Sequence, residues 1–431
     1  MSQVVAWTAV ALAAGLLALW AAALWPWRGL LGRLWREPVL AVPVVTLESD
    51  DWGPRADPEG EARALRALAG VLAAQRDAEG RPAVMTLGVV LAAPDGRVWR
   101  EAGPDALRRG IWPRVRLADP SQAPILEAVR EGTLRGVFVA QLHGMEHCWP
   151  PAVRAVAARD ARVAGWLRSG PVPDPAALPP VLQTRWADCS TLPSRPIPED
   201  LVEEAVQEEV AAWRALFGTP PRVAVPPTFV WTAAVERAWA ARGVRCVVTP
   251  GVRHEGRDAA GRPAPGPVVL NGERAAGGAR YLVRDVHFEP ARGHRPEAAL
   301  RAVLARARQG RPVLIETHRE SYVGEGAAEA REALRALLES VRAALPDVRF
   351  LPAETVARAL SQGASSPLVA ASLRRRIGAW AARVLALPGA RRRLRWSGLG
   401  LVLAGVAAAL GPRPEAAAAE AGRPRPAGGA A

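Results

Sequence analysis

Three short apolar runs in the sequence end in side chains that can bind a metal ion or transfer a proton. These side chains are Asp50 and Asp51, His143 and His147, and His318. Two histidines and one carboxylate provide three ligands and leave a position open, as a catalytic zinc centre requires. Because His143 and His147 are four residues apart, a helix or a tight turn can bring both to one ion. The pattern predicts metal-assisted hydrolysis.

The segments between these side chains indicate how they come together. Strands alternate with helices over about 300 residues, which is typical of a parallel sheet or barrel. The expected strands begin at Val44 and then span Val84–Leu91, Val137–Leu142, Val223–Val225, Val244–Val248, Tyr281–Phe288, Val313–Thr317 and Val348–Leu351. The expected helices are Glu61–Arg76, Ile125–Val129, Ala152–Arg168, Glu199–Phe217, one reaching Trp239, Ala298–Arg308, Gly326–Ala344 and Ala353–Leu360. In a parallel barrel the C-terminal ends of the strands line one mouth, so the three sets of side chains should converge there.

The motifs, in this order, resemble those of the polysaccharide deacetylase (NodB-like) family, carbohydrate esterase family four. The resemblance covers approximately Val39–Leu360. Ser49-Asp50-Asp51 matches the first motif, His143 to His147 the second, and Leu314 to His318 the fifth. The resemblance implies a distorted (β/α) barrel of seven or eight strands. It also implies a hydrolase that removes acetyl groups, bound as amides or esters, from a saccharide.

The same resemblance assigns roles to the five side chains. Asp51, His143 and His147 would bind a divalent metal ion, with zinc as the expected ion. Asp50 would be the general base and His318 the general acid. In chemical terms, the base takes a proton from the attacking water, and the acid protonates the departing amine.

Two motifs depart from the family pattern. The third usually carries an Arg two residues before a Pro, where this chain has Ala224 or Val225. Either Arg284 or Arg319 substitutes for that Arg, which orients the base in the family, or the site is tuned differently. In the second motif, Gly144 stands where the family has a hydroxyl residue.

Five further residues are candidates for orienting groups or for binding the substrate. In the loose fourth motif, either Asp285 or Glu289 would orient His318, although both also suit a surface charge. The backbone amides near Thr228 and Phe229 are candidates for the oxyanion contact. Trp52 is expected at the mouth, where its ring would stack on a sugar or simply pack.

Two other functions remain open at this point. His143 to His147 also spells H-x-x-E-H, the inverted-zincin pattern, in which Glu146 is the base on a helix. A strand running directly into His143, together with Gly144 and Trp149-Pro150-Pro151, argues against a helix there. The second alternative is a non-catalytic glycan-binding membrane protein on the same fold, because the third-motif Arg is missing.

Both ends of the chain predict contact with a membrane. Val4 to Trp27 is uncharged and long enough to cross a bilayer as a helix, and Arg28, Arg33 and Arg36 follow it. Leu373 to Arg395 is rich in arginine and suits a helix on an anionic membrane surface. Trp396 to Gly411 is uncharged but short for a full crossing. The flanking arginines favour a bacterial inner-membrane protein with its central region in the cytoplasm, with a periplasmic domain on an uncleaved signal anchor as the alternative.

These observations predict four segments. Residues 1–36 form a transmembrane helix with a basic flank, and 37–362 form the barrel. Residues 363–411 are a basic amphipathic and short hydrophobic membrane segment, and 412–431 are a disordered tail. The expected partners are an N-acetylated saccharide and a lipid bilayer, and the membrane ends favour a membrane-proximal or lipid-linked saccharide; no oligomeric state is indicated.

The composition does not favour a nucleic-acid partner. The 431 residues carry a formal net charge of +14, and every basic residue other than histidine is arginine. Arginine is spread through the whole chain, and no basic–aromatic platform or zinc-finger spacing accompanies it. The three cysteines, Cys148, Cys189 and Cys246, are too far apart in sequence to suggest a CxxC pair or a disulfide framework.

Overall fold

The computed structural model describes residues 2–108 and 112–412 and contains a closed barrel of parallel strands. The ring runs in the order β1-β2-β5-β6-β7-β8-β9, and β9 pairs with β1 to close it. These strands are β1 (Val44–Trp52), β2 (Met85–Val89), β5 (Phe138–Leu142), β6 (Val223–Ala224), β7 (Cys246–Thr249), β8 (Arg280–His287) and β9 (Val313–His318). The predicted (β/α) barrel is confirmed, with seven strands in the ring. An eighth strand, β10 (Arg349–Phe350), pairs with Val44 and Val45 of β1.

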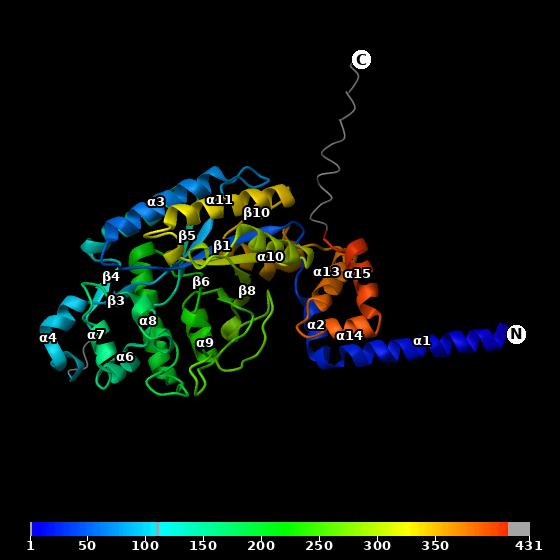
Figure 1. The fold of residues 1–431 in the computed structure, drawn as a ribbon, viewed down its shortest axis with the longest axis horizontal. Coiled ribbons are helices and arrows are strands. Elements are labelled where there is room, and N and C mark those ends of the chain that lie inside the picture. The colour runs from blue at the N-terminus through cyan, green and yellow to red at the C-terminus, as the bar shows by residue number, and fades with distance from the viewer. Residues whose placement is uncertain (1, 109–111, 413–431) are drawn as a thin grey trace, which may run out of the picture.

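Helices surround the barrel (Figure 1). They are α3 (Pro58–Ala74), α5 (Ala123–Leu134), α8 (Glu199–Phe217), α9 (Ala233–Ala241), α10 (Pro296–Arg308), α11 (Ala327–Ala344) and α12 (Ala353–Gln362). In α3, the Asp57 side chain accepts a hydrogen bond from the Gly60 amide and caps the helix. Leu65, Leu68 and Leu72 lie on one face of α3 and are fully buried. Each such leucine stabilises the fold by roughly 1.5–3 kcal/mol.

Two segments on the mouth side of the barrel differ from the expected elements. A hairpin of β3 (Ala92–Pro94) and β4 (Arg114–Arg116) and the helix α4 (Gly96–Arg108) follow β2, where no element was expected. The single helix expected at Ala152–Arg168 is two helices, α6 (Pro150–Ala157) and α7 (Ala161–Trp166). The first helix ends at Ala157, and Asp160 caps the second by accepting a hydrogen bond from the Arg162 amide.

The register of the strands makes part of the barrel interior polar. Glu48 on β1 lies opposite Glu316 on β9, and Asp50 lies opposite His318. Because side chains alternate between the two faces of a strand, residues two apart share a face. Glu48 and Asp50 therefore lie on the same side of β1, with Glu316 and His318 beside them.

The two ends of the chain pack against each other at one end of the barrel. We call this unit the terminal bundle: the end of α1 (Ser2–Leu24), α2 (Arg28–Arg36), α13 (Leu373–Leu385), α14 (Arg391–Trp396) and α15 (Leu399–Leu410). The indole of Trp20 donates a hydrogen bond to the carbonyl of Ser397, at 3.0 Å. The expected surface helix is interrupted at Pro388-Gly389, and α15 packs back against α13. One helical stretch in the described part of the chain, Val5–Arg36, is long and apolar enough to span a membrane. The predicted disordered tail lies outside the described residues from 413 onward.

Candidate active site and metal centre

A cleft of about 620 Å³ opens where the barrel strands end. The five residues with predicted catalytic or ligand roles all line it: Asp50, Asp51, His143, His147 and His318. They come from β1, β9 and the turn after β5, so ring closure brings together residues that are up to 268 positions apart in the sequence.

Asp51 and the two histidines of the turn after β5 form a compact group. Asp51 Oδ1 lies 3.2 Å from His143 Nε2 and 3.3 Å from His147 Nε2. Neither contact has the geometry of a hydrogen bond, so Asp51 Oδ1 is buried without a hydrogen-bond partner among the described residues. One donor atom from each residue falls within 4.8 Å of the others. Ligands bound at about 2.1 Å in a tetrahedron lie about 3.4 Å apart, so the donor types and their spacing fit a divalent ion.

The fold fixes the orientation of both histidines. The Nδ1 of His143 lies 2.9 Å from the carbonyl of Val225, so Nδ1 is the donor in that hydrogen bond and Nε2 is the ring nitrogen that points toward Asp51. Burial lowers the pKa of His147 to about 4, so that ring is neutral at physiological pH. Gly144 lies between them with φ of 93°. A hydroxyl residue would be strained at this backbone conformation, which accounts for the departure from the second motif.

The segment His143 to His147 is a turn, and a buried acid supports it. The amide of Met145 donates a hydrogen bond to Glu209 of α8 at 3.1 Å. Trp239 of α9 donates to the same carboxylate at 2.6 Å. Burial raises the pKa of Glu209 to about 7. This support was not predicted, because nothing in the α8 sequence marks one of its several acids as buried.

Asp50 has a different environment from its neighbour. Its Oδ2 accepts a hydrogen bond from Arg284 Nη2 at 2.6 Å, and its Oδ1 is buried without a partner among the described residues. Arg284 is 1% exposed and also lies 3.4 Å from Glu48 and 3.5 Å from Glu316. Burial alone would raise the pKa of Asp50, but the charge of Arg284 holds it below its usual value. The carboxylate is therefore ionised and can accept a proton.

Asp50 also requires a glycine on the next strand. A Cβ on Gly88 of β2 would lie 2.2 Å from Asp50 Oδ1, so any larger residue would displace the carboxylate. Sequence reasoning missed this residue, as well as the roles of Glu48 and Glu316. The alternation of side chains along β1 and β9 was the available signal.

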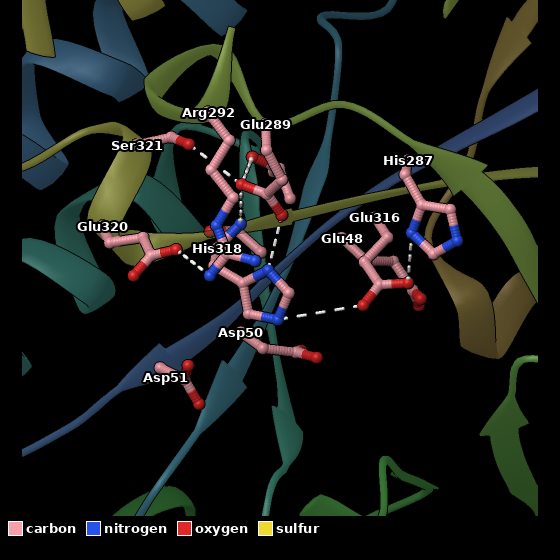
Figure 2. A network of polar contacts seen from close by, with 12 residues as sticks. Glu48, Asp50, Asp51, His287, Glu289, Arg292, Glu316, His318, Glu320 and Ser321 are labelled. Carbon is pink, nitrogen blue, oxygen red and sulfur yellow. Dashed lines mark hydrogen bonds and ion pairs between the residues drawn. The ribbon is translucent and has the colours of Figure 1, made fainter. Parts of the chain in front are cut away.

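His318 is oriented by Glu289 (Figure 2). The Nδ1 of His318 lies 2.5 Å from Glu289 Oε1, and its backbone amide donates to Glu289 Oε2 at 3.2 Å. Ser321 donates to the same carboxylate at 2.9 Å. Burial alone would lower the pKa of His318, but the bond to Glu289 and the charges of Asp51 and Asp50 raise it to about 9. The ring is therefore protonated at neutral pH, as an acid must be.

These contacts bear on three sets of candidate residues from the sequence. Arg284 contacts Asp50, whereas Arg319 pairs with Glu61 at 2.7 Å. Glu289 contacts His318, whereas Asp285 pairs with Arg306 at 2.8 Å. The amide of Phe229 already donates to Pro226, which leaves that of Thr228 as the candidate of the two for an oxyanion contact. Thr228 and Phe229 both line the cleft, and both have positive φ, 54° and 55°.

The prediction that Trp52 lies at the mouth of the barrel is wrong. Trp52 is 1% exposed and packs in the main core, with its indole donating to Ser49 Oγ at 3.0 Å. The pairing of β1 with β2 shifts register between Ser49 and Trp52, and Asp51 has φ of 73°. This irregularity lets Asp51 reach the cleft and turns Trp52 inward, so its ring cannot stack on a sugar.

The surroundings of Glu146 do not suit a catalytic base. Glu146 is 1% exposed, it pairs with Arg114, and its Oε2 accepts from Arg185 at 2.6 Å. Because the segment is also a turn, the helix that the inverted-zincin pattern needs is absent there. The three cysteines are free and buried, and none joins the group around Asp51.

Comparisons with known proteins find likeness only among solved structures. No model of a protein family matches the sequence, and no curated protein matches it. The similar structures include polysaccharide deacetylases and family 4 carbohydrate esterases. A putative polysaccharide deacetylase from Mycobacterium smegmatis is 14% identical, with 78% of this chain and 99% of that chain covered and a TM-score of 0.38.

Two further structures are family 4 proteins with different properties. An acetyl xylan esterase from Clostridium thermocellum, in complex with a cobalt ion, is 12% identical over 73% of this chain and 89% of that chain, with a TM-score of 0.34. A family 4 pseudoenzyme from Bacillus anthracis is 10% identical over 69% of this chain and 60% of that chain, with a TM-score of 0.30. At these identities and scores, the likeness assigns no role to any side chain of this chain.

Proposed function

We propose that this chain is a metal-dependent hydrolase that removes acetyl groups from an acetylated saccharide. The observation that carries the proposal is the division of labour between two adjacent carboxylates. Asp51 lies with two histidines in a group that fits a divalent ion. Asp50 is paired with Arg284 and lies beside His318 on the neighbouring strand, and both line the same cleft. Ligands, base and acid are thus three separate sets of side chains, as metal-assisted hydrolysis requires.

Asp51, His143 and His147 would hold the ion, and zinc is the ion that this donor set suits. When bound, the ion would polarise the acyl carbonyl and ease deprotonation of water. Asp50 accepts the proton of the attacking water at Oδ1, because Oδ2 is occupied by Arg284. The Thr228 amide is the proposed donor to the developing oxyanion. His318 then protonates the leaving nitrogen or oxygen, and Glu289 holds its ring in position.

The site itself bears on the non-catalytic alternative. A binding protein has no need for an ionised buried carboxylate beside a protonated histidine. In this chain the pKa of Asp50 is lowered although burial alone would raise it. The pKa of His318 is raised to about 9 although burial alone would lower it. Perturbed groups of opposite kind that meet in one cleft favour catalysis.

We also propose a location and a domain division. The apolar helix within Val5–Arg36 anchors the protein in a membrane, and the barrel of residues 37–362 lies on one side of it. The predicted segments 1–36 and 363–411 act as one unit, because they share the apolar cluster of the terminal bundle.

Acetate release tests the proposed function. Purified full-length protein is stripped of metal, reloaded with zinc, and assayed on N-acetylated and O-acetylated sugars. We expect release of acetate by the reloaded protein and loss of release after stripping. A reloaded, folded protein that releases no acetate from any of these sugars would favour the binding protein.

A pair of variants tests the peptidase alternative. Asp50→Asn should abolish turnover, because the base is lost. Glu146→Gln should keep its turnover number when this is calculated per folded molecule. The reverse pattern would identify Glu146 as the base.

A further inference from the structure

The terminal bundle docks on the end of the barrel where the strands begin. Arg33 of α2 pairs with Glu273 at 2.7 Å, in the segment that precedes β8. Arg383 of α13 donates to the carbonyl of Gln309 at 2.9 Å, just before β9. The C-terminal ends of the strands, where the cleft opens, therefore lie at the opposite end of the barrel.

The connection between bundle and barrel is short and held in place. Residues Glu37 to Pro43 link α2 to β1. Within them, Leu40 donates to the carbonyl of Gly310 and Ala41 to that of Leu368, both at 2.9 Å. Glu37 is buried and pairs with Arg311 at 2.8 Å. The barrel consequently has no flexible linker here on which to turn relative to the bundle.

Large apolar side chains are exposed on α1 and α15. On α1, Trp7 is 73% exposed, and on α15, Leu401 is 83% exposed. α14 carries four arginines and contacts both α1 and α15, which suits anionic lipid headgroups. In Figure 1, α1 leaves the bundle in the direction away from the barrel, while α4, α6 and α7 lie at the far end. Trp166 of α7 lines the cleft.

The length of β1 sets the distance between the two ends. It has nine residues and runs from the bundle to the cleft. At about 3.3 Å per residue, and with the usual strand tilt, these residues separate the ends by roughly 20–30 Å along the barrel axis. A sugar attached directly to a lipid of the same bilayer would lie at the wrong end of the molecule.

From this geometry we infer that the cleft opens away from the bilayer and takes acetylated sugar units of a saccharide chain that extends well beyond the membrane surface. The inference rests on the proposed function and refines its substrate. It replaces the membrane-proximal or lipid-linked saccharide expected from the sequence with an extended saccharide.

The orientation is tested without any assay of activity. Single cysteines replace Ala177, which is exposed near the cleft, and Leu401 on α15. The native cysteines are buried, so each introduced thiol can be labelled selectively with a fluorophore in full-length protein in vesicles whose lipids carry an energy acceptor. We expect strong transfer from position 401 and weak transfer from position 177. Equal transfer from both positions would overturn the inference.

The substrate class is tested with a series of lipid-anchored probes. N-acetylglucosamine is joined to a lipid through polyethylene glycol spacers of increasing length and placed in the same vesicles as the protein. A linker too short to span the gap gives an effective concentration near zero, so we expect acetate release only when the reach exceeds roughly 20–30 Å. Soluble N-acetylglucosamine oligomers provide the reference, and Asp50→Asn provides the background.

The outcomes separate the two proposals. Release that is fastest for the shortest spacer would overturn the inference while supporting the hydrolase. Failure to release acetate from any probe or oligomer would count against the hydrolase, and the fluorescence result would still decide the orientation.

Discussion

Asp50 and Asp51 are adjacent in the sequence but occupy two unlike regions of the site. The side chain of Asp51 is 34% exposed and faces two imidazole rings with an unpartnered oxygen. Asp50 is buried and shares the guanidinium of Arg284 with two more carboxylates. The Asp51 region is suited to gaining a cation, and the Asp50 region already contains one. The comparison indicates how a single strand end can supply both a metal ligand and a base.

The largest expected effect is a loss of activity on changing the Asp51 region. Asp51→Ala should lower kcat/KM by about a thousandfold or more, since Lewis-acid assistance provides several kcal/mol and each 1.36 kcal/mol is tenfold. The measurement is acetate release at saturating zinc. Activity within tenfold of the unmodified protein would mean that the Asp51 group is not the metal centre.

The next effect concerns the stability of the Asp50 region. Arg284→Met removes the cation between Asp50, Glu48 and Glu316, and should cost about 3 kcal/mol in the free energy of unfolding. Denaturant unfolding measures it, with Arg306→Met as a matched control. Arg306 pairs with Asp285 in a partly exposed position, where such pairs contribute about 1 kcal/mol or less. Similar costs for the two variants would contradict the charge cluster.

A smaller effect is expected in the pH dependence of activity. His318 acts as an acid in its protonated form, and its pKa is raised to about 9, so activity should fall as the pH rises through about 9. Glu289→Gln removes the hydrogen bond to a charged acceptor, lowers the pKa of His318 and moves this alkaline limb to lower pH. The loss of kcat at neutral pH should be roughly tenfold. An unchanged alkaline limb would assign the limb to another group.

The smallest effect on activity is expected for a change outside the Asp50 and Asp51 regions. Asp285→Asn should leave kcat and the alkaline limb unchanged, because Asp285 pairs with Arg306 and does not reach His318. A pH profile identical to that of the unmodified protein supports the assignment of Glu289. A shift like that of Glu289→Gln would reverse it.

The sequence predicted the backbone of the site better than its interactions. Asp51, His143 and His318 were placed at strand ends because apolar runs stop there, and the barrel brings those ends together. The partner of Asp50 could not be chosen, because Arg284 reaches it from β8 only after the ring has closed. Trp52 was misplaced because the irregular backbone at Asp51, with its positive φ, turns the next side chain inward. No feature of the sequence marks that irregularity.

The barrel interior was the other part that the sequence reading missed. Glu48 and Glu316 each precede a predicted site residue by two positions, so strand alternation alone places them beside it. Burial raises the pKa of Glu48 to about 7. An acid at the end of an apolar run is more simply taken as a surface residue, and only the closed ring makes it an interior one.

Metal content of the two aspartate variants tests the division of labour most directly. Asp50→Asn and Asp51→Asn are purified beside the unmodified protein, equilibrated with zinc and freed of excess metal, and the bound zinc is counted by mass spectrometry. We predict about one ion per chain in the unmodified protein and in Asp50→Asn, neither of which alters the ligand group, and none in Asp51→Asn. Zinc retained by Asp51→Asn, or lost equally from both variants, would contradict the account.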